Sequence, residues 1–535
     1  MYVEVENLRI PVRDIEKNAR DIDNKLRPYI AEYCSIVETE IADIKVISKS
    51  IDARKKGWPV LTYKVQFRIK NAVRGMRNFK EIDASTEKKT SFLLELDPKN
   101  KVQNPIVVGT GPAGLLAAWM LAYYGMKPIV IDCGTNVEQR HEDITNFKKT
   151  RELNENSNYL YGEGGAGTYS DGKLYTRKKD DRIKFVIDLF IKYGAPKKIG
   201  IVNRPHIGSD KLRSMVAKMR EEIISLGGEY RWNCKVTDII VKDNQCYGVK
   251  LESGETLESE KTILAFGLSS RDLIEQLIET GVDHELKDFQ IGTRIEHRQE
   301  LIDRNQYGMD FARHESLPPA EYNFVSRPQA IEGINRVSTF CMCPGGTIVP
   351  ATAERGMLST NGMSNFARNN KFANSCLIVN QKSDCFATTK DAFKFLRDIE
   401  SAAFVAGGSD YTAPGQDASA FIKGQAKFLS PTTSYCFGIK PFDLNEILPG
   451  ETADSIAYAL NFFERKCKGF MKDGKLIGVE THISSPVRFT RDFESMQTSV
   501  KNLYIAGEGA GYAGGIMSAA IDGLKIAEKI ILNEN

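Results

Sequence analysis

The sequence lacks several features that mark specialised classes of protein. Its 73 basic and 70 acidic residues leave a formal net charge of only +3, so the surface as a whole is not that of a polyanion-binding protein. Its ten cysteines include no CxxC pair, which argues against a zinc site and, in a chain of this length, against a disulfide framework. We therefore expect a protein of the reducing cytoplasm that holds no metal ion.

The sequence also predicts no targeting segment and no membrane-spanning segment. Glu4 and Glu6 lie where a secretory signal would carry basic residues followed by an apolar run. The uncharged stretch at residues 102–126 is long enough to span a bilayer, but glycines and prolines divide it into a strand, a turn and a helix. We expect no contact with a membrane.

The length of 535 residues and the mean hydropathy of −0.33 indicate a globular chain of about three or four domains. Residues 1–100 form the first expected domain, a small α/β unit. Residues 2–10 and the alternating segment LTYKVQFRIK predict strands, and apolar residues at helical spacing between Ile15 and Ile30 predict a helix. Pro28 is expected to break or kink this helix.

A basic segment crosses this first domain. Residues 45–80 contain eleven Lys or Arg residues and one acid, Asp52. Such a patch could attract RNA, DNA or another acidic partner. The favoured interpretation is a solvated strand face that acidic residues elsewhere in the domain balance.

A dinucleotide-binding motif follows. An apolar strand runs into GTGPAG and then into the apolar helix LLAAWMLAYYG, which begins after Pro112 and Ala113. In this motif one glycine makes a tight turn, one lets a pyrophosphate approach the backbone, and one lets helix pack closely on strand; these are Gly109, Gly111 and Gly114. The next predicted strand ends at Asp132, where a carboxylate would accept hydrogen bonds from both ribose hydroxyls.

A second match to the same pattern occurs in GEGGAGTYSDGKL, which holds Gly165 and Lys173. No apolar strand precedes it and no apolar helix follows it. We therefore expect a loop whose bare backbone contacts a flat ligand, rather than a second nucleotide fold.

The C-terminal segment favours FAD over NAD. Its strand NLYIAGEG leads into a glycine-rich turn and a final helix. FAD needs such a second return to the nucleotide, because its ribityl chain and isoalloxazine extend beyond the pyrophosphate. We expect Glu508 to accept a hydrogen bond from a ribityl hydroxyl and the helix to direct its positive end at the flavin. The expected contacts here are Gly507, Glu508, Gly514, Gly515 and Ile516.

Several longer motifs strengthen this interpretation: GTGPAG, GEGGAGTYSDGKL, NRPHIGSDKLR, IGTRIEH, CMCPGGTIVPATAE, NGMS, SPVRFTRD and GEGAGYAGGIMSAAIDG. With them the chain resembles the bacterial family of FAD-dependent dehydrogenases with an N-terminal extension, often labelled NAD(FAD)-utilising dehydrogenases. The family lies within the two-domain FAD/NAD(P)-binding flavoproteins. In that class Val236 and the three residues before it would supply backbone contacts to adenine, and Gly267 would end the A-x-G crossing strand. One departure is Asp132, where a Glu is commoner.

The fold class that follows is α/β. It comprises a small N-terminal α/β domain (residues 1–100), a discontinuous Rossmann-like FAD-binding domain (101–284 and 481–535) and an inserted mixed-sheet substrate domain (285–480). The candidate catalytic residues lie mainly in the inserted domain: Arg294, His297, Glu354, Asn361 and, just beyond it, Arg488. An arginine could bind a substrate carboxylate and His297 could move a proton, whereas the alternative for each residue is an ion pair or a hydrogen bond in the core.

The expected function is that of an FAD-dependent oxidoreductase that transfers hydride between an unidentified small molecule and flavin N5. NADH or NADPH is a possible electron donor, although no second strand-GxGxxG-helix is present to bind it. Two alternatives stay open: a flavoprotein acting on or through nucleic acid, and a non-catalytic flavin-binding sensor. Cys341 and Cys343 raise the possibility of a redox-active dithiol, but core strand residues are the favoured interpretation.

Overall fold

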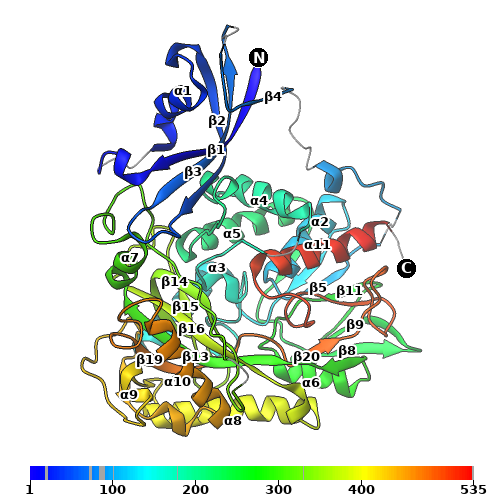
Figure 1. Ribbon diagram of the computed structural model, residues 1–535. Helices are drawn as coiled ribbons and strands as arrows, with labels where there is room; N and C mark the ends of the chain where they lie inside the picture. Colours follow the sequence, from blue (N-terminus) through cyan, green and yellow to red (C-terminus); the bar gives the residue numbers. More distant parts are fainter. Residues whose placement is uncertain are drawn as a thin grey trace.

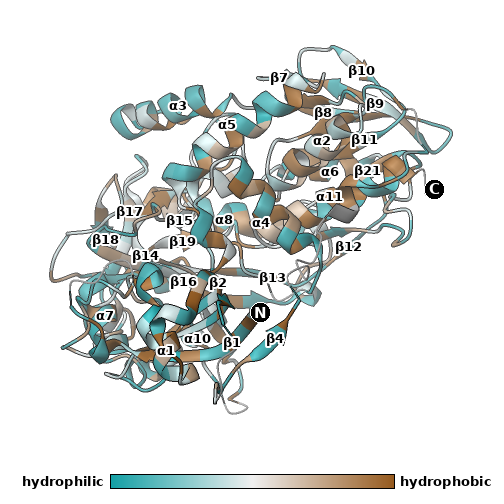
Figure 2. Ribbon diagram, turned by 90° about the horizontal axis from the view of Figure 1, so that it is seen from above, coloured by the Kyte–Doolittle hydropathy of each residue, from teal (hydrophilic) through white to brown (hydrophobic). Residues whose placement is uncertain are grey.

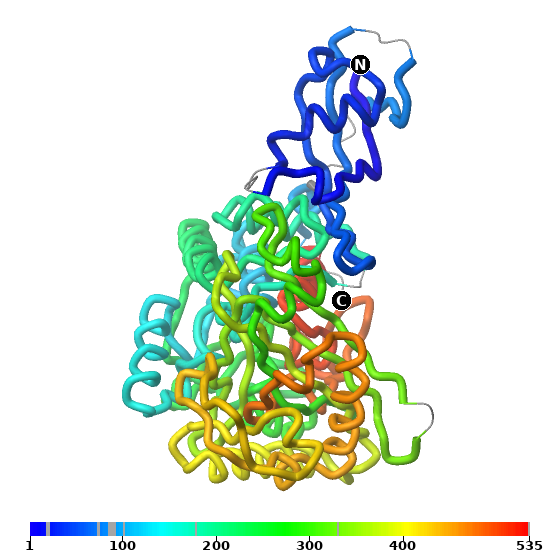
Figure 3. The backbone as a smooth tube through the Cα atoms, turned by 60° about the vertical axis from the view of Figure 1, so that its left-hand side comes forward, coloured from blue at the N-terminus to red at the C-terminus, as the bar shows by residue number. Residues whose placement is uncertain are grey.

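The computed structural model describes residues 1–17, 22–71, 75–83, 91–99, 102–176, 179–328 and 331–532. The N-terminal part forms a four-stranded antiparallel sheet in the order β2-β3-β1-β4, at one end of the molecule (Figures 1 and 3). Its elements are β1 (Tyr2–Pro11), α1 (Arg27–Cys34), β2 (Ile41–Asp52), β3 (Val60–Ile69) and β4 (Lys80–Ile82).

Buried and partly exposed residues alternate along β3, so one face of this sheet packs in the core against α1. Tyr63, Val65 and Phe67 are buried in a core that includes Ile30 of α1, whereas the residues between them are partly exposed. The helix predicted between Ile15 and Ile30 needs correction: residues 18–21 lie outside the description, and α1 begins only at Arg27. Pro28 lies in the first turn of α1, where its missing N–H is not needed, so it helps start the helix instead of breaking it.

A five-stranded parallel sheet forms the centre of the molecule, in the order β21-β11-β5-β6-β7. Its strands are β5 (Ile106–Val108), β6 (Ile129–Ile131), β7 (Glu229–Arg231), β11 (Thr262–Leu264) and β21 (Leu503–Ile505). Helices pack on the face that holds Val107 and Val130: α2 (Pro112–Tyr123), α4 (Arg182–Lys192), α5 (Ser209–Ser225) and α11 (Ile516–Leu532). Figure 2 shows the apolar residues along α2 and α11.

The opposite face, with Ile106 and Val108, packs against an antiparallel sheet of β8 (Val236–Lys242), β9 (Gln245–Leu251) and β10 (Thr256–Glu258). Two further helices border this unit, α3 (Val137–Thr150) and α6 (Arg271–Glu279). A two-stranded ribbon of β12 (His284–Leu286) and β20 (Val487–Phe489) lies at the passage to the third sheet. Strand β12 precedes the segment that carries the third sheet and β20 follows it, so the two ends of that segment pair with each other.

The third sheet has seven strands in the order β15-β14-β16-β13-β19-β17-β18. It is mixed, because β17 and β18 are parallel and the other neighbours are antiparallel. Its strands are β13 (Phe289–Arg298), β14 (Val337–Pro350), β15 (Thr360–Met363), β16 (Phe372–Gln381), β17 (Ala413–Asp417), β18 (Ile439–Pro441) and β19 (Lys475–Glu480). Its helices are α7 (Gln299–Tyr307), α8 (Thr389–Gly407), α9 (Ala418–Phe421) and α10 (Gly450–Glu464).

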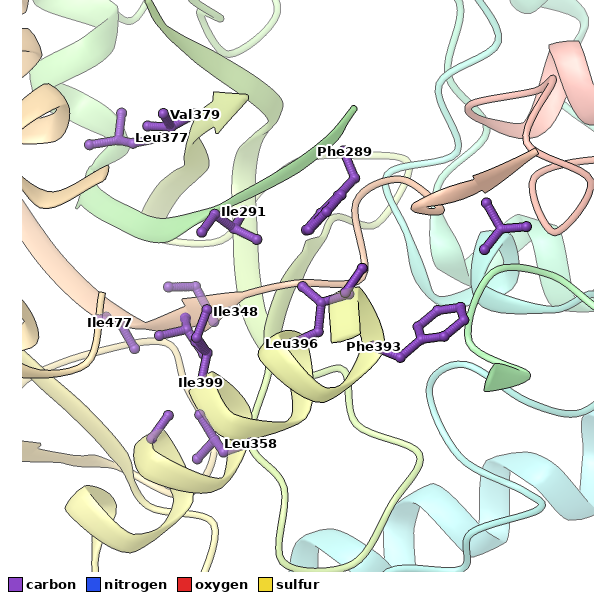
Figure 4. Close-up of a cluster of buried hydrophobic side chains, with 14 of the residues drawn as sticks. Phe289, Ile291, Ile348, Leu358, Leu377, Val379, Phe393, Leu396, Ile399 and Ile477 are labelled. Atoms are coloured by element: carbon purple, nitrogen blue, oxygen red, sulfur yellow. The ribbon is translucent and has the colours of Figure 1, made fainter. Parts of the chain in front are cut away.

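A large apolar core joins the strands of this sheet to α8 (Figure 4). Phe289 and Ile291 of β13 lie near Leu396 and Ile399 of α8, and Ile477 of β19 belongs to the same cluster. The architecture confirms the predicted fold class, a Rossmann-like α/β unit combined with a mixed-sheet unit and a small N-terminal α/β unit. In the described part of the chain, no helix has the length and apolar character needed to cross a bilayer.

Candidate functional site

A cavity of about 770 Å³ is lined by residues of both the parallel sheet and the seven-stranded sheet. At one end it begins at the turn between β5 and α2. Gly109 has a φ of 93°, a value that favours glycine, and Gly111 is the residue before the first turn of α2. A Cβ atom at Gly111 would contact only the Cα of Gly165, at 3.8 Å, so the backbone here is open to a ligand.

Most of the residues predicted to contact the cofactor line this cavity. They are Gly109, Gly111, Pro112, Ala113, Asp132, Gly165, Lys173, Cys234, Lys235, Val236, Gly267, Gly507, Glu508, Gly514, Gly515 and Ile516. Asn233 and Gly114 are outside the lining, and at Gly114 a Cβ would lie 1.9 Å from the Gly109 carbonyl oxygen. Gly114 therefore serves the close packing of α2 on β5 and not ligand contact.

Asp132 lies just beyond the end of β6 and is fixed by its neighbours. Its Oδ2 accepts hydrogen bonds from the backbone N–H of Thr110 (2.9 Å) and from the Thr110 hydroxyl (2.5 Å). Its Oδ1 accepts one from the N–H of Gly134 (2.9 Å). Both lone-pair sites of Oδ2 are taken by Thr110, but Oδ1 has a further site, so the side chain can still accept a hydrogen bond from a ribose.

Arg140 of α3 holds the glycine-rich loop against this turn. It is fully buried and donates to the carbonyl oxygens of Asn158 (2.8 Å), Glu163 (2.7 Å) and Gly165 (2.9 Å). Burial lowers the pKa of Arg140 to about 10. The sequence offers no signal for this clamp, because the arginine lies on an ordinary amphipathic helix more than twenty residues before the loop it fixes.

Another part of the cavity wall is formed by Lys173, Glu508 and the start of α11. Burial raises the pKa of Glu508 to about 8, against the opposing effect of Lys287. Gly514 and Gly515 precede α11, whose N-terminus carries the positive end of the helix dipole. The cavity also receives Phe340, Cys341, Asn361 and Glu480 from the seven-stranded sheet.

Two of the five candidate catalytic residues line the cavity, Glu354 and Asn361. Glu354 is held by two cations: its Oε2 lies 3.1 Å from Arg397 Nε and its Oε1 lies 3.6 Å from an Arg271 nitrogen. Asn361 accepts a hydrogen bond from Arg294 (2.8 Å) through its Oδ1. Its amide is therefore fixed at the cavity wall.

Arg294 lies behind the wall and not in it. It is fully buried and pairs with Glu480, with Nε 2.7 Å from Oε2. Its other N–H groups donate to Asn361, Asn374 and the carbonyl oxygen of Cys341. With its donors occupied it cannot bind a substrate carboxylate, so we reassign it as a residue that positions Glu480, Asn361 and Cys341.

His297 and Arg488 also lie outside the cavity lining. His297 is 1% exposed, its Nε2 lies 2.7 Å from the Phe470 carbonyl oxygen, and burial lowers its pKa to about 4. It contacts the Phe470 ring and not the cavity. Arg488 forms a surface ion pair with Glu285 (2.8 Å). Because neither side chain reaches the cavity, we remove both from the catalytic candidates.

The structure adds cavity residues that sequence reasoning missed: Phe340, Glu480 and His482. Cys341, for which a core position was the favoured interpretation, also lines the cavity. Burial raises the pKa of Glu480, although Arg294 counteracts part of this effect. Burial lowers the pKa of His482 to about 4, and its Nδ1 lies 2.9 Å from the Ser269 hydroxyl oxygen. A weak signal existed, because Glu480 ends a buried strand and His482 lies just beyond it.

Several basic residues of the N-terminal sheet and its β2–β3 turn are paired with nearby acids. Lys64 lies 2.7 Å from both Glu4 and Glu6, and Arg68 lies 2.6 Å from Asp43. Arg54 pairs with Asp52 and Lys49 with Asp23. Among the described residues there is no group of three or more His, Cys, Asp or Glu side chains placed to hold a metal ion.

The cavity fits an extended dinucleotide cofactor. Cβ atoms at Gly267 and Gly515 would meet nothing within 4 Å, so bare backbone faces the cavity at several points along its length. The N-terminus of α2 offers free N–H groups and a positive dipole to phosphates beside Gly111. The fold and this site define an FAD-binding protein of the Rossmann-like class.

Comparison with known proteins gives the family. The chain is 39% identical over 530 residues to an uncharacterized protein of Clostridium beijerinckii. The alignment covers 98% of this chain and 99% of that protein. The chain belongs to the same family as this protein. Residues 288–483 match a family described as FAD-dependent protein, C-terminal domain-like, and residues 4–68 match a domain of unknown function. Together with the cavity, the first match identifies FAD as the cofactor.

Solved structures with a similar fold share little sequence with the chain. The glycerol-3-phosphate dehydrogenase of Bacillus halodurans, complexed with FAD, is 11% identical with a TM-score of 0.36, covering 82% of this chain and 66% of that one. A geranylgeranyl bacteriochlorophyll reductase-like protein of Thermoplasma acidophilum is 11% identical with a TM-score of 0.34, covering 80% and 77%.

Proposed function

We propose that the protein is an FAD-dependent oxidoreductase that transfers hydride between a small-molecule substrate and the flavin. The observation that carries the proposal is the shared cavity, whose wall comes from the nucleotide fold on one side and from the seven-stranded sheet on the other. When bound, FAD supplies the hydride chemistry at its N5 atom. The NAD(FAD)-utilising dehydrogenases that the sequence resembles are the finer assignment within this class.

The residues proposed to hold FAD follow the cavity from end to end. Val236 lies at the adenine end, and Asp132 would accept a hydrogen bond from the ribose. The backbone at Gly111 and the N-terminus of α2 would bind the pyrophosphate. Glu508, whose pKa burial raises to about 8, is protonated at neutral pH, so it could donate a hydrogen bond to a ribityl hydroxyl as well as accept one.

The substrate would meet the wall formed by the seven-stranded sheet. Asn361 presents an amide fixed by Arg294, and Glu480 presents a buried carboxyl group paired with the same arginine. Such fixed polar groups can orient a polar substrate without first losing side-chain freedom. The low pKa of His482 keeps its imidazole neutral near pH 7, so it can accept a hydrogen bond from a substrate.

The two alternatives have less support. A role on nucleic acid rested on the basic segment, but Lys64, Arg68 and Lys49 have acidic partners within 2.7 Å. A non-catalytic sensor would not need a cavity wall with fixed amide and carboxyl groups. The expected partner is a small molecule that reaches this wall.

The test uses the purified, FAD-loaded protein without oxygen. NADH and NADPH are added separately, followed by small alcohols, amines and hydroxy acids, and loss of the visible flavin absorbance is timed. Once a donor is found, Asn361→Ala should slow flavin reduction tenfold or more while FAD stays bound, because the amide that orients the donor is gone; tenfold corresponds to about 1.4 kcal/mol.

Asn380→Ala is the matched control, because Asn380 is an exposed residue of β16 that bonds Asp288. Its flavin should be reduced at the wild-type rate. A protein that takes up no FAD would overturn the proposal. Equal reduction rates in wild type, Asn361→Ala and Glu480→Gln would overturn the assignment of the catalytic wall.

A further inference from the structure

Cys341 and Cys343 lie in an irregular part of β14 that borders the cavity. In the pairing with β16, Phe340 faces Cys376 and Cys343 faces Asn374, so β14 holds one extra residue in a bulge. Cys341 has a φ of 45°, a left-handed conformation that is uncommon for any residue with a side chain. Such local strain is often found at functional sites.

The bulge gives the two cysteines different surroundings. Cys341 lines the cavity together with Phe340, whereas Cys343 is 0% exposed. The Cys343 thiol lies 3.3 Å from the Cys341 carbonyl oxygen. In a regular strand, residues two apart are separated by about 6.6 Å, close to the upper limit for a disulfide. The bulge breaks this regular spacing and places the Cys343 sulfur against the Cys341 backbone.

Two cations hold this segment, Lys173 at the cavity and the fully buried Arg294. The ammonium group of Lys173 donates to the carbonyl oxygen of Met342, between the two cysteines, and lies 2.9 Å from Asp171. Arg294 donates to the carbonyl oxygen of Cys341 (3.1 Å) from the opposite side. A cation near a thiol favours its thiolate form.

The pKa values of the two cysteines shift in opposite directions, which favours a thiolate at Cys341 and a thiol at Cys343. Interaction with the Cys343 side chain lowers the pKa of Cys341 below its ordinary value, with help from Lys173 and Arg294 and against the effects of burial and of Asp171. The same interaction, together with burial, raises the pKa of Cys343 well above its ordinary value. At neutral pH the residue at the cavity is the nucleophilic member and the buried residue carries the proton.

The position of the pair relative to the cofactor site completes the argument. Cys341 lines the same cavity as Lys173 and Glu508, and its charge contributes to the raised pKa of Glu508. With the ribityl chain placed beside Glu508 in the proposed function, the flavin ring would lie next to this part of the wall. A dithiol at this point can exchange electrons with the ring.

We propose that Cys341 and Cys343 form a redox-active dithiol that exchanges two electrons with FAD. The inference rests on the proposed function, because it needs the flavin beside this part of the cavity wall. In the forward direction the Cys341 thiolate and the Cys343 thiol form an S–S bond, and the S–H bond of Cys343 breaks. The two electrons and the proton pass to FAD, which becomes singly protonated reduced flavin, so charge and atoms balance. The reverse step reopens the disulfide.

The first test counts electrons. The FAD-loaded protein is oxidised and then titrated with dithionite without oxygen. The wild-type protein should take up four electrons per FAD, two for the flavin and two for the disulfide. Cys341→Ser and Cys343→Ser should each take up two. Cys385→Ser, which changes an exposed cysteine outside the cavity lining, should still take up four.

The second test needs no variant, so a misfolded mutant cannot blur the result. Oxidised and reduced holoprotein are alkylated after denaturation and analysed by mass spectrometry. The peptide with Cys341 and Cys343 should be protected in the oxidised sample and doubly alkylated in the reduced one. An uptake of two electrons by the wild type, with double alkylation in both samples, would overturn the dithiol while leaving the oxidoreductase intact. Failure to take up FAD would overturn both.

Discussion

His297 and Arg294 show what strand geometry adds to a sequence motif. Both come from the segment TRIEH, yet they lie three positions apart on β13, and successive residues of a strand face opposite sides. Arg294 therefore turns to Glu480 and Asn361 behind the cavity wall, whereas His297 turns to Phe470 in the core. Residue type alone suggested proton transfer for His297; parity along the strand could have separated it from Arg294.

We predict that His297 makes the stability of the protein depend on pH. Its pKa is about 4 in the folded protein and about 6.5 when unfolded. Above pH 6.5 it is neutral in both states; below it, the unfolded chain binds a proton that the folded protein refuses. The free energy of unfolding should therefore fall by about 2 kcal/mol between roughly pH 7.5 and pH 5 through this residue alone. Urea titrations of wild type and His297→Gln measure the difference.

In His297→Gln this part of the pH dependence should disappear, because Gln does not titrate and can still donate to the Phe470 carbonyl oxygen. Carboxyl groups titrate in the same range, so only the difference between the two proteins is informative. His284→Gln is the control, since His284 is an exposed residue of β12. Parallel profiles for wild type and His297→Gln would refute the assignment of a buried neutral imidazole.

At the scale of elements, the turn between β5 and α2 could be predicted and the bulge in β14 could not. Three glycines at fixed spacing, between an apolar strand and an apolar helix, determine the turn through local sterics alone. The bulge depends on how β14 pairs with β16, thirty residues later in the chain. No pattern in the segment FCMCPGG indicates that pairing, so the sequence alone predicts that Cys341 and Cys343 are ordinary core residues.

The two glycines of this turn should respond differently to the same substitution. In Gly111→Ala the new methyl group would meet only Gly165, at an ordinary distance of 3.8 Å, and the φ of −65° suits alanine. Stability without FAD should change by less than about 0.5 kcal/mol, while the Kd for FAD rises tenfold or more because the methyl group occupies the approach of the pyrophosphate. Thermal unfolding and flavin fluorescence measure the two effects.

Gly114→Ala should instead act on the fold. Its methyl group would lie 1.9 Å from the Gly109 carbonyl oxygen, so α2 must move away from β5. Overpacking of this kind lowers the free energy of unfolding by about 1–3 kcal/mol or more.

If Gly111→Ala kept wild-type affinity for FAD, the pyrophosphate would not lie against this turn.

Across the whole molecule, the FAD site depends on two distant parts of the chain. Strand β21, near the C-terminus, pairs with β11, and α11 packs against α2. The sequence predicted that a C-terminal strand, glycine turn and helix return to the nucleotide. The neighbours they would find, β11 and the first turn of α2, depend on contacts between residues about 240 and 400 positions apart, which local patterns do not encode.

The contact of α11 with α2 gives the last prediction. A Cβ at Gly523 would lie 2.0 Å from the carbonyl oxygen of Ala113, in the first turn of α2. Gly523→Ala should therefore push α11 away, lower stability by about 1–3 kcal/mol, and raise the Kd for FAD tenfold or more, because the starts of both helices line the cavity. Gly450→Ala, where a Cβ meets nothing within 4 Å at the start of α10, is the control and should be neutral or slightly stabilising. Stability and FAD affinity should fall together in Gly523→Ala; a loss of stability with unchanged affinity would show that the cofactor does not bridge the two ends of the chain.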